Sequence, residues 1–149
     1  MSKIKWVKPD FKTELAEYFN NSYAKTFFKK RGLVFKHKPE LEGFLSAGKL
    51  ERITKQMLLA NPDNISLTEA DFKIVIKDEE YSASYISMCE ALIQEGSLTM
   101  PAPIIIKFGR TYYGYAGNKR INLAFRNKIP LMVWLVSTTV LNPTNRSLN

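Results

Sequence analysis

The chain has 149 residues, of which 45% are hydrophobic and 24% charged, so it can bury one core and resembles a folded globular domain in composition. No apolar run approaches the roughly twenty residues of a membrane span, and the first residues lack the apolar stretch of a secretion signal. Lysine and arginine outnumber aspartate and glutamate by 22 to 14, a net charge of +8, and the single cysteine, Cys89, excludes an intrachain disulfide. We therefore expect a cytoplasmic protein without membrane attachment, whose positive charge attracts polyanions.

The first sixty residues are predicted to form short helices. Apolar residues recur at helical spacing after Asp10 and after Ser22, two residues that can cap a helix. The second of these helices is predicted to end at Gly32, and Pro39 suits the first turn of a third. A fourth helix is predicted from the spacing of Leu50, Ile53, Met57 and Leu58.

From about residue 71 the pattern changes to strands alternating with helices. The predicted elements are strands at 72–77, 103–107, 111–115 and 130–136, with helices at 81–95 and from 117 onward. The expected fold is a single α+β domain: a helical N-terminal part (1–66), a β-α-β-β-α-β core (67–136) and a polar tail (137–149).

An anion site is predicted where the strand at 111–115 runs into the last helix. Gly117 permits a positive φ, and the free N–H groups and dipole of a helix start attract a phosphate. Lys119 and Arg120 add two cations in the first turn. Tyr113 and Tyr115 share one face of the preceding strand, and we expect that face to lie near the ligand. Without further context, a turn with solvated charges is the commoner explanation.

The order of elements around this loop strengthens the hypothesis. An apolar strand after Pro103, a hairpin, Gly-x-x-Arg at a helix start, and Ile129-Pro130 before an apolar strand follow one another. With the predicted helix before Gly96, this order resembles the core of the ParB/sulfiredoxin superfamily over about residues 72–136. The resemblance implies a phosphate- or nucleotide-binding loop made of Gly117, Asn118, Lys119 and Arg120.

The loop departs from the family's enzymes at three positions. Ala116 stands where many members carry aspartate, Asn118 where cysteine or histidine is expected, and Lys119 in place of the usual histidine. Asparagine is neither a nucleophile nor a general base, and lysine is a poor base at neutral pH. We therefore expect phosphate binding to survive and the family's chemistry, sulfiredoxin activity above all, to be lost.

One acidic group keeps catalysis open. Asp78, Glu79 and Glu80 precede the predicted helix at the place where the resemblance implies a catalytic glutamate in family kinases. Carboxylates facing a phosphate site can hold Mg²⁺ or act as a base, so these three are the candidate catalytic residues. The structural alternative is compensation of the helix dipole.

A basic segment lies between Tyr23 and Lys38. It has no acid, and its cations are candidates for nucleic-acid contact: Lys25, Lys29, Lys30, Arg31, Lys36 and Lys38. Aromatic residues between them could stack on bases, although the spacing of Tyr23, Phe27 and Phe28 is equally that of a helix face packed in a core. His37 and Cys89 have no partners at metal-ligand spacing, so no metal site is expected.

Three functions remain open. The first is a protein that binds a nucleotide or nucleic acid, of the kind found as phage or mobile-element accessory factors. The second is a Mg²⁺-dependent enzyme that uses a nucleotide, whether hydrolase, kinase or nuclease, with Lys119 and Arg120 on the phosphate. The third is an interaction module whose positive surface meets an acidic host protein.

Overall fold

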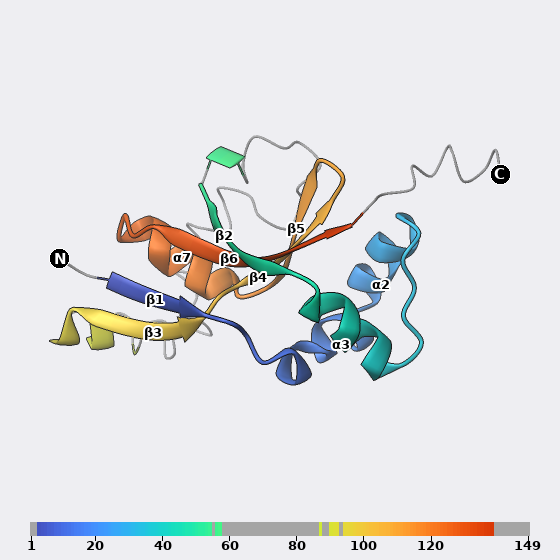
Figure 1. Cartoon of the computed structure of the whole chain (residues 1–149), viewed down its shortest axis with the longest axis horizontal. Coiled ribbons are helices and arrows are strands. Elements are labelled where there is room, and N and C mark those ends of the chain that lie inside the picture. Colours follow the sequence, from blue (N-terminus) through green and yellow to red (C-terminus); the bar gives the residue numbers. More distant parts are fainter. Residues whose placement is uncertain (1–2, 55, 58–86, 88–89, 93, 139–149) are drawn as a thin grey trace.

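The computed structural model describes residues 3–54, 56–57, 87, 90–92 and 94–138 (Figure 1). This part of the chain mixes helices and strands, which confirms the α+β class. The strands are β1 (Lys3–Val7), β2 (Lys49–Ile53), β3 (Ser97–Pro101), β4 (Ile104–Phe108), β5 (Thr111–Ala116) and β6 (Leu131–Thr138). The helices are the 3-10 turn η1 (Phe11–Glu14), α1 (Ala16–Phe19), α2 (Ser22–Lys29), α3 (Lys38–Ser46) and α7 (Asn118–Arg126). Among the described residues, no helix combines the length and apolarity that crossing a membrane requires.

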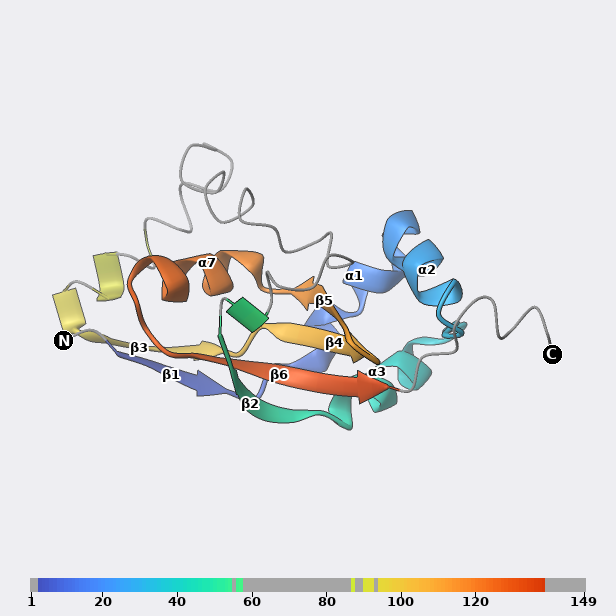
Figure 2. The ribbon, with the colours of Figure 1, turned by 90° about the horizontal axis from the view of Figure 1, so that it is seen from above.

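The main sheet has four strands in the order β2-β6-β4-β5, and β1 pairs with β3 in a second, two-stranded parallel sheet (Figure 2). β4 and β5 form an antiparallel hairpin, after which the chain returns through α7 and places β6 parallel to β4. β2 completes the sheet antiparallel to β6. The inner strand β4 begins with Ile104, Ile105 and Ile106, which are all fully buried, as expected for a strand covered on both faces.

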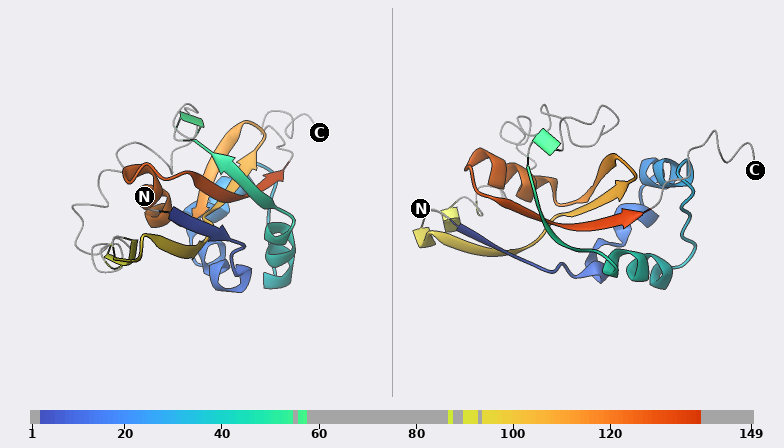
Figure 3. Two further views of the ribbon diagram at one scale, coloured as in Figure 1. Left: turned by 60° about the vertical axis from the view of Figure 1, so that its left-hand side comes forward. Right: turned by 45° about the horizontal axis from the view of Figure 1, so that its top comes forward.

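Aromatic side chains join the N-terminal helices to this sheet. The rings of Phe27 and Phe28 on α2 lie 5.6 Å and 5.3 Å from the ring of Phe108, which precedes the hairpin turn. On the other side of β6, the Trp134 Nε1 donates a hydrogen bond of 2.7 Å to the carbonyl of Leu45 on α3. α2 and α3 therefore sit at one end of the long axis, while α7 and the β1–β3 pair lie toward the other (Figures 1 and 3).

The helix predicted after Gly48 is wrong over residues 49–53, which form β2. Five residues gain little from local helix formation, and pairing their backbone with β6 satisfies more of their hydrogen bonds. Gly48 makes that pairing reachable, since a Cβ there would lie 2.6 Å from the Leu135 carbonyl oxygen and 2.6 Å from Trp134 Nε1. The glycine therefore ends α3 and lets the chain pass close to β6.

The helical description of residues 1–66 is wrong for a second reason: the segment also supplies β1. That strand pairs with β3, about ninety residues later, and β3 was not predicted either. The Trp6 Nε1 donates to the carbonyl of Pro130 at 3.0 Å and ties this small sheet to the approach to β6. Both strands are only five residues long, and among the described residues each pairs with the other, so the pairing depends on segments far apart in the sequence.

Several local predictions are confirmed. The Asp10 carboxylate caps the first turn by accepting from the Lys12 amide, and α2 is followed by Gly32 with φ 86°. The cap of α2 is Asn21 instead of Ser22, since its Oδ1 accepts from the Ala24 amide at 3.1 Å. β4, β5, α7 and β6 all appear at their predicted places.

Other predictions cannot be compared with the structure. The strand at 72–77, most of the helix at 81–95 and residues 139–149 of the tail lie outside the described residues.

Candidate functional site: the Gly117 loop and a basic surface

Gly117 is held in a conformation and a space that only glycine fits. It is the N-cap of α7 in the left-handed region, φ 97° and ψ 28°, as the sequence predicts. A Cβ would lie 2.8 Å from the Pro103 Cβ, 2.9 Å from the Pro103 Cα and 2.8 Å from Arg120 Nη2. The Gly117 carbonyl accepts from the amides of Arg120 and Ile121, both at 3.0 Å, and closes the first turn. Glycine has no side chain that can accept hydrogen bonds from the first amides of the helix. A bound anion can accept them instead.

Arg120 turns inward from this loop. Its Nη1 donates to the Pro101 carbonyl at 2.5 Å, so the side chain connects α7 to the end of β3. Burial lowers the pKa of Arg120, and the negative charge of Glu14 acts in the opposite direction. The residue predicted to grip a phosphate thus has a structural bond, and its guanidinium is partly removed from water.

Asn118 and Lys119 are the first two residues of α7, in the first turn as predicted. The candidate catalytic residues Asp78, Glu79 and Glu80 lie outside the described residues. No group of three or more metal-binding side chains occurs within the described ranges.

Tyr113 and Tyr115 are core residues, and the prediction that they face the ligand is wrong. Their side chains are 5% and 4% exposed, and their rings lie 5.5 Å and 6.3 Å from the ring of Phe28. The Tyr115 hydroxyl donates to the Glu14 carbonyl at 2.6 Å. The strand alternation was correct, but α2 covers the face that we expected to be open to a ligand.

Two acids of the η1–α1 segment, Glu14 and Glu17, lie near these phenols, and no sequence pattern singles them out. Burial raises the pKa of Glu17, and the neighbouring Glu14 raises it further. Burial also raises the pKa of Tyr113 to about 12, with smaller contributions from Tyr23 and Glu17. Burial is also the main cause of the raised pKa of Tyr115. The groups come together only because α1 and α2 pack onto β5.

Five lysines of α2 and the following segment form a second candidate site. All are exposed, and together they are called the basic surface here: Lys25, Lys29, Lys30, Lys36 and Lys38. No acid occurs between Glu17 and Glu40. Tyr23, 48% exposed, stands on the same helix and leaves its ring accessible.

Arg31 differs from these lysines. Its guanidinium carbon lies 3.5 Å from the centre of the Phe27 ring, and its Nη1 donates to the Phe27 carbonyl at 3.1 Å. It is half-buried, so its first role is to close the C-terminal end of α2 over the aromatic core. His37 also has a structural place, because its amide donates to the Glu40 carboxylate at the start of α3.

The basic surface and the Gly117 loop belong to different elements. α2 lies at one end of the long axis, and α7 runs from the end of β5 toward the other end (Figures 1 and 2). Comparison with known proteins brings no further residues into view, since no family model, curated protein or solved structure matches the chain.

Proposed function

We propose that this protein binds the phosphate backbone of a nucleic acid through the basic surface. The observation that carries the proposal is that five lysines within fourteen residues are all exposed, with no acid among them. Such a group concentrates a polyanion and releases its counterions on binding. Tyr23 adds an accessible ring on which a base can stack.

The Gly117 loop is proposed as a second, weaker phosphate contact, in a core of the ParB/sulfiredoxin type. The left-handed glycine at the start of α7 and the order β4-β5-α7-β6 support this. Asn118 offers no nucleophile or base, so binding is favoured over a Mg²⁺-dependent reaction. The inward bond of Arg120 makes this loop a poorer phosphate clamp than its sequence suggests.

The test compares two double variants with equal loss of charge. Lys25→Ala/Lys29→Ala removes two neighbouring cations of the basic surface, and alanine preserves the helix. Lys3→Ala/Lys5→Ala removes two exposed cations of β1, at the opposite end of the molecule (Figure 1). Binding of a fluorescent random-sequence duplex is measured by anisotropy over a range of salt concentrations.

We expect the α2 variant to lower the slope of log K against log salt by about 1.8, since each phosphate contact contributes ~0.9. The β1 variant should keep the wild-type slope. An equal loss of slope in both variants would mean that only the net charge matters, which would contradict the proposal. If the wild type binds no DNA or RNA and instead binds an acidic protein, the interaction-module alternative replaces it.

A further inference from the structure

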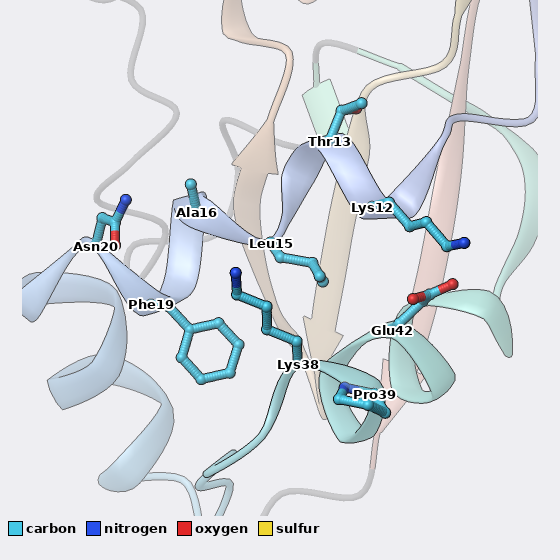
Figure 4. Close-up of a pocket in the computed structure, with 9 residues that line it drawn as sticks. All are labelled: Lys12, Thr13, Leu15, Ala16, Phe19, Asn20, Lys38, Pro39 and Glu42. Atoms are coloured by element: carbon cyan, nitrogen blue, oxygen red, sulfur yellow. The ribbon is translucent and has the colours of Figure 1, made fainter.

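A pocket of about 410 Å³ opens between the η1–α1 segment and α3 (Figure 4). Its apolar wall is formed by Leu15, Phe19 and Pro39, and the last two contribute ring side chains. The volume lies within the range of small-molecule sites, about 300–1,000 Å³.

The charged side chains that line the pocket are two lysines, Lys12 and Lys38, and one glutamate, Glu42. Lys12 and Glu42 point toward one another at one end, whereas the Lys38 ammonium points into the space between Leu15 and Phe19 (Figure 4). Within the described part of the chain, Lys38 forms no ion pair. A cation above an apolar wall attracts an anion that carries an apolar body.

We propose that this pocket binds one nucleotide, with its phosphate on Lys38 and its base against Phe19 and Pro39. The inference rests on the proposed function, because Lys38 belongs to both the basic surface and the pocket, so a strand bound at Lys38 lies beside the pocket. The Asn20 amide can donate to or accept from a base edge, and the Glu42 carboxylate can accept from sugar hydroxyls or an exocyclic amine. The nucleotide is either free or an unpaired unit of a single strand.

The test uses the full chain and three probes: a nucleoside 5′-monophosphate, a single-stranded oligonucleotide and a duplex of equal length. Phe19→Leu removes the ring and keeps an apolar side chain, and Lys38→Gln removes the cation. Lys5→Gln, an exposed residue on β1, is the matched control for charge. Thermal unfolding of each variant checks the fold, and Lys38→Gln keeps the test valid if Phe19→Leu is unstable.

We expect Phe19→Leu to weaken single-strand binding by about tenfold and leave duplex binding unchanged, since one stacked base contributes roughly this factor. Lys38→Gln should weaken monophosphate and single-strand binding more than Lys5→Gln does. Weaker binding of the single strand alone identifies the strand as the source; weaker monophosphate binding as well shows that the free nucleotide also enters.

If folded Phe19→Leu and Lys38→Gln bind the monophosphate and the single strand as the wild type does, the pocket proposal is overturned. The proposed function would then stand if Lys25→Ala/Lys29→Ala still loses duplex binding. Conversely, loss of monophosphate binding in the pocket variants with no effect of the α2 variant on duplex binding would retain the pocket and remove the nucleic-acid function.

Discussion

Gly117→Ala should be strongly destabilising, and its cost can be separated into two causes. The first is backbone strain: φ 97° lies in a region that costs a residue with a Cβ about 1–2 kcal/mol. The second is contact, because the new methyl group would lie 2.8–2.9 Å from two atoms of Pro103. Such overpacking typically costs about 1–3 kcal/mol. We therefore expect a loss of about 2–5 kcal/mol in the free energy of unfolding.

Three other glycines separate these causes. Gly96 has φ 71° with nothing within 4 Å of an added Cβ, so Gly96→Ala should show strain alone. Gly48→Ala meets the Leu135 oxygen at 2.6 Å and should show contact alone. Gly43 lies in α3 with open space around it, and Gly43→Ala should stabilise by up to about 1 kcal/mol.

Urea unfolding followed by circular dichroism measures all four variants. The expected order of stability is Gly43→Ala above wild type, then Gly96→Ala, with Gly48→Ala and Gly117→Ala lowest. A loss below about 1 kcal/mol for Gly117→Ala would refute the assigned geometry. The approach of α7 to Pro103 would then have to be looser than described.

Three smaller predictions follow. Asn21→Ala should cost about 1 kcal/mol and Ser22→Ala under ~0.5 in urea unfolding, because Asn21 accepts from the Ala24 amide; a larger loss for Ser22→Ala would assign the cap to Ser22. Arg31→Lys should cost about 1 kcal/mol at constant charge, because lysine loses both the guanidinium contact with the Phe27 ring and the bond to the Phe27 carbonyl; an unchanged urea midpoint would contradict this role. The raised pKa of Tyr113, about 12, means that the unfolded chain ionises first above pH 10. Its contribution, on the order of 2 kcal/mol, is present below pH 10 and lost between pH 10 and 12, so the stability difference between wild type and Tyr113→Phe should change only in that window.

Within the core, the sequence predicted what depends on neighbours along the chain. The β4–β5 hairpin turn, Gly117 at the start of α7, and the apolar strand after Pro130 all come from residues a few positions apart. Each signal has a local physical cause, such as a positive φ, a missing N–H or a run of apolar residues. These parts therefore appeared at their predicted places.

The same local patterns misled where distant pairing decided the outcome. Residues 49–53 have helical spacing but complete the sheet beside β6, and β1 finds its partner in β3. Tyr113 and Tyr115 alternate as a strand should, yet nothing in their spacing says that α2 lies over them. Backbone pairing and burial between distant segments outweigh the propensity of five residues.

The sequence by itself determined the class of fold, the position of the Gly117 loop and the excess of positive charge after Tyr18. Only the tertiary structure decided that Arg120 bonds to the Pro101 carbonyl and that Arg31 lies over the Phe27 ring, so both guanidinium groups make structural contacts within the protein. It also made the pocket at Lys38 by bringing α1 against α3. Composition sets how many charges a chain carries, and packing sets which of them face a ligand.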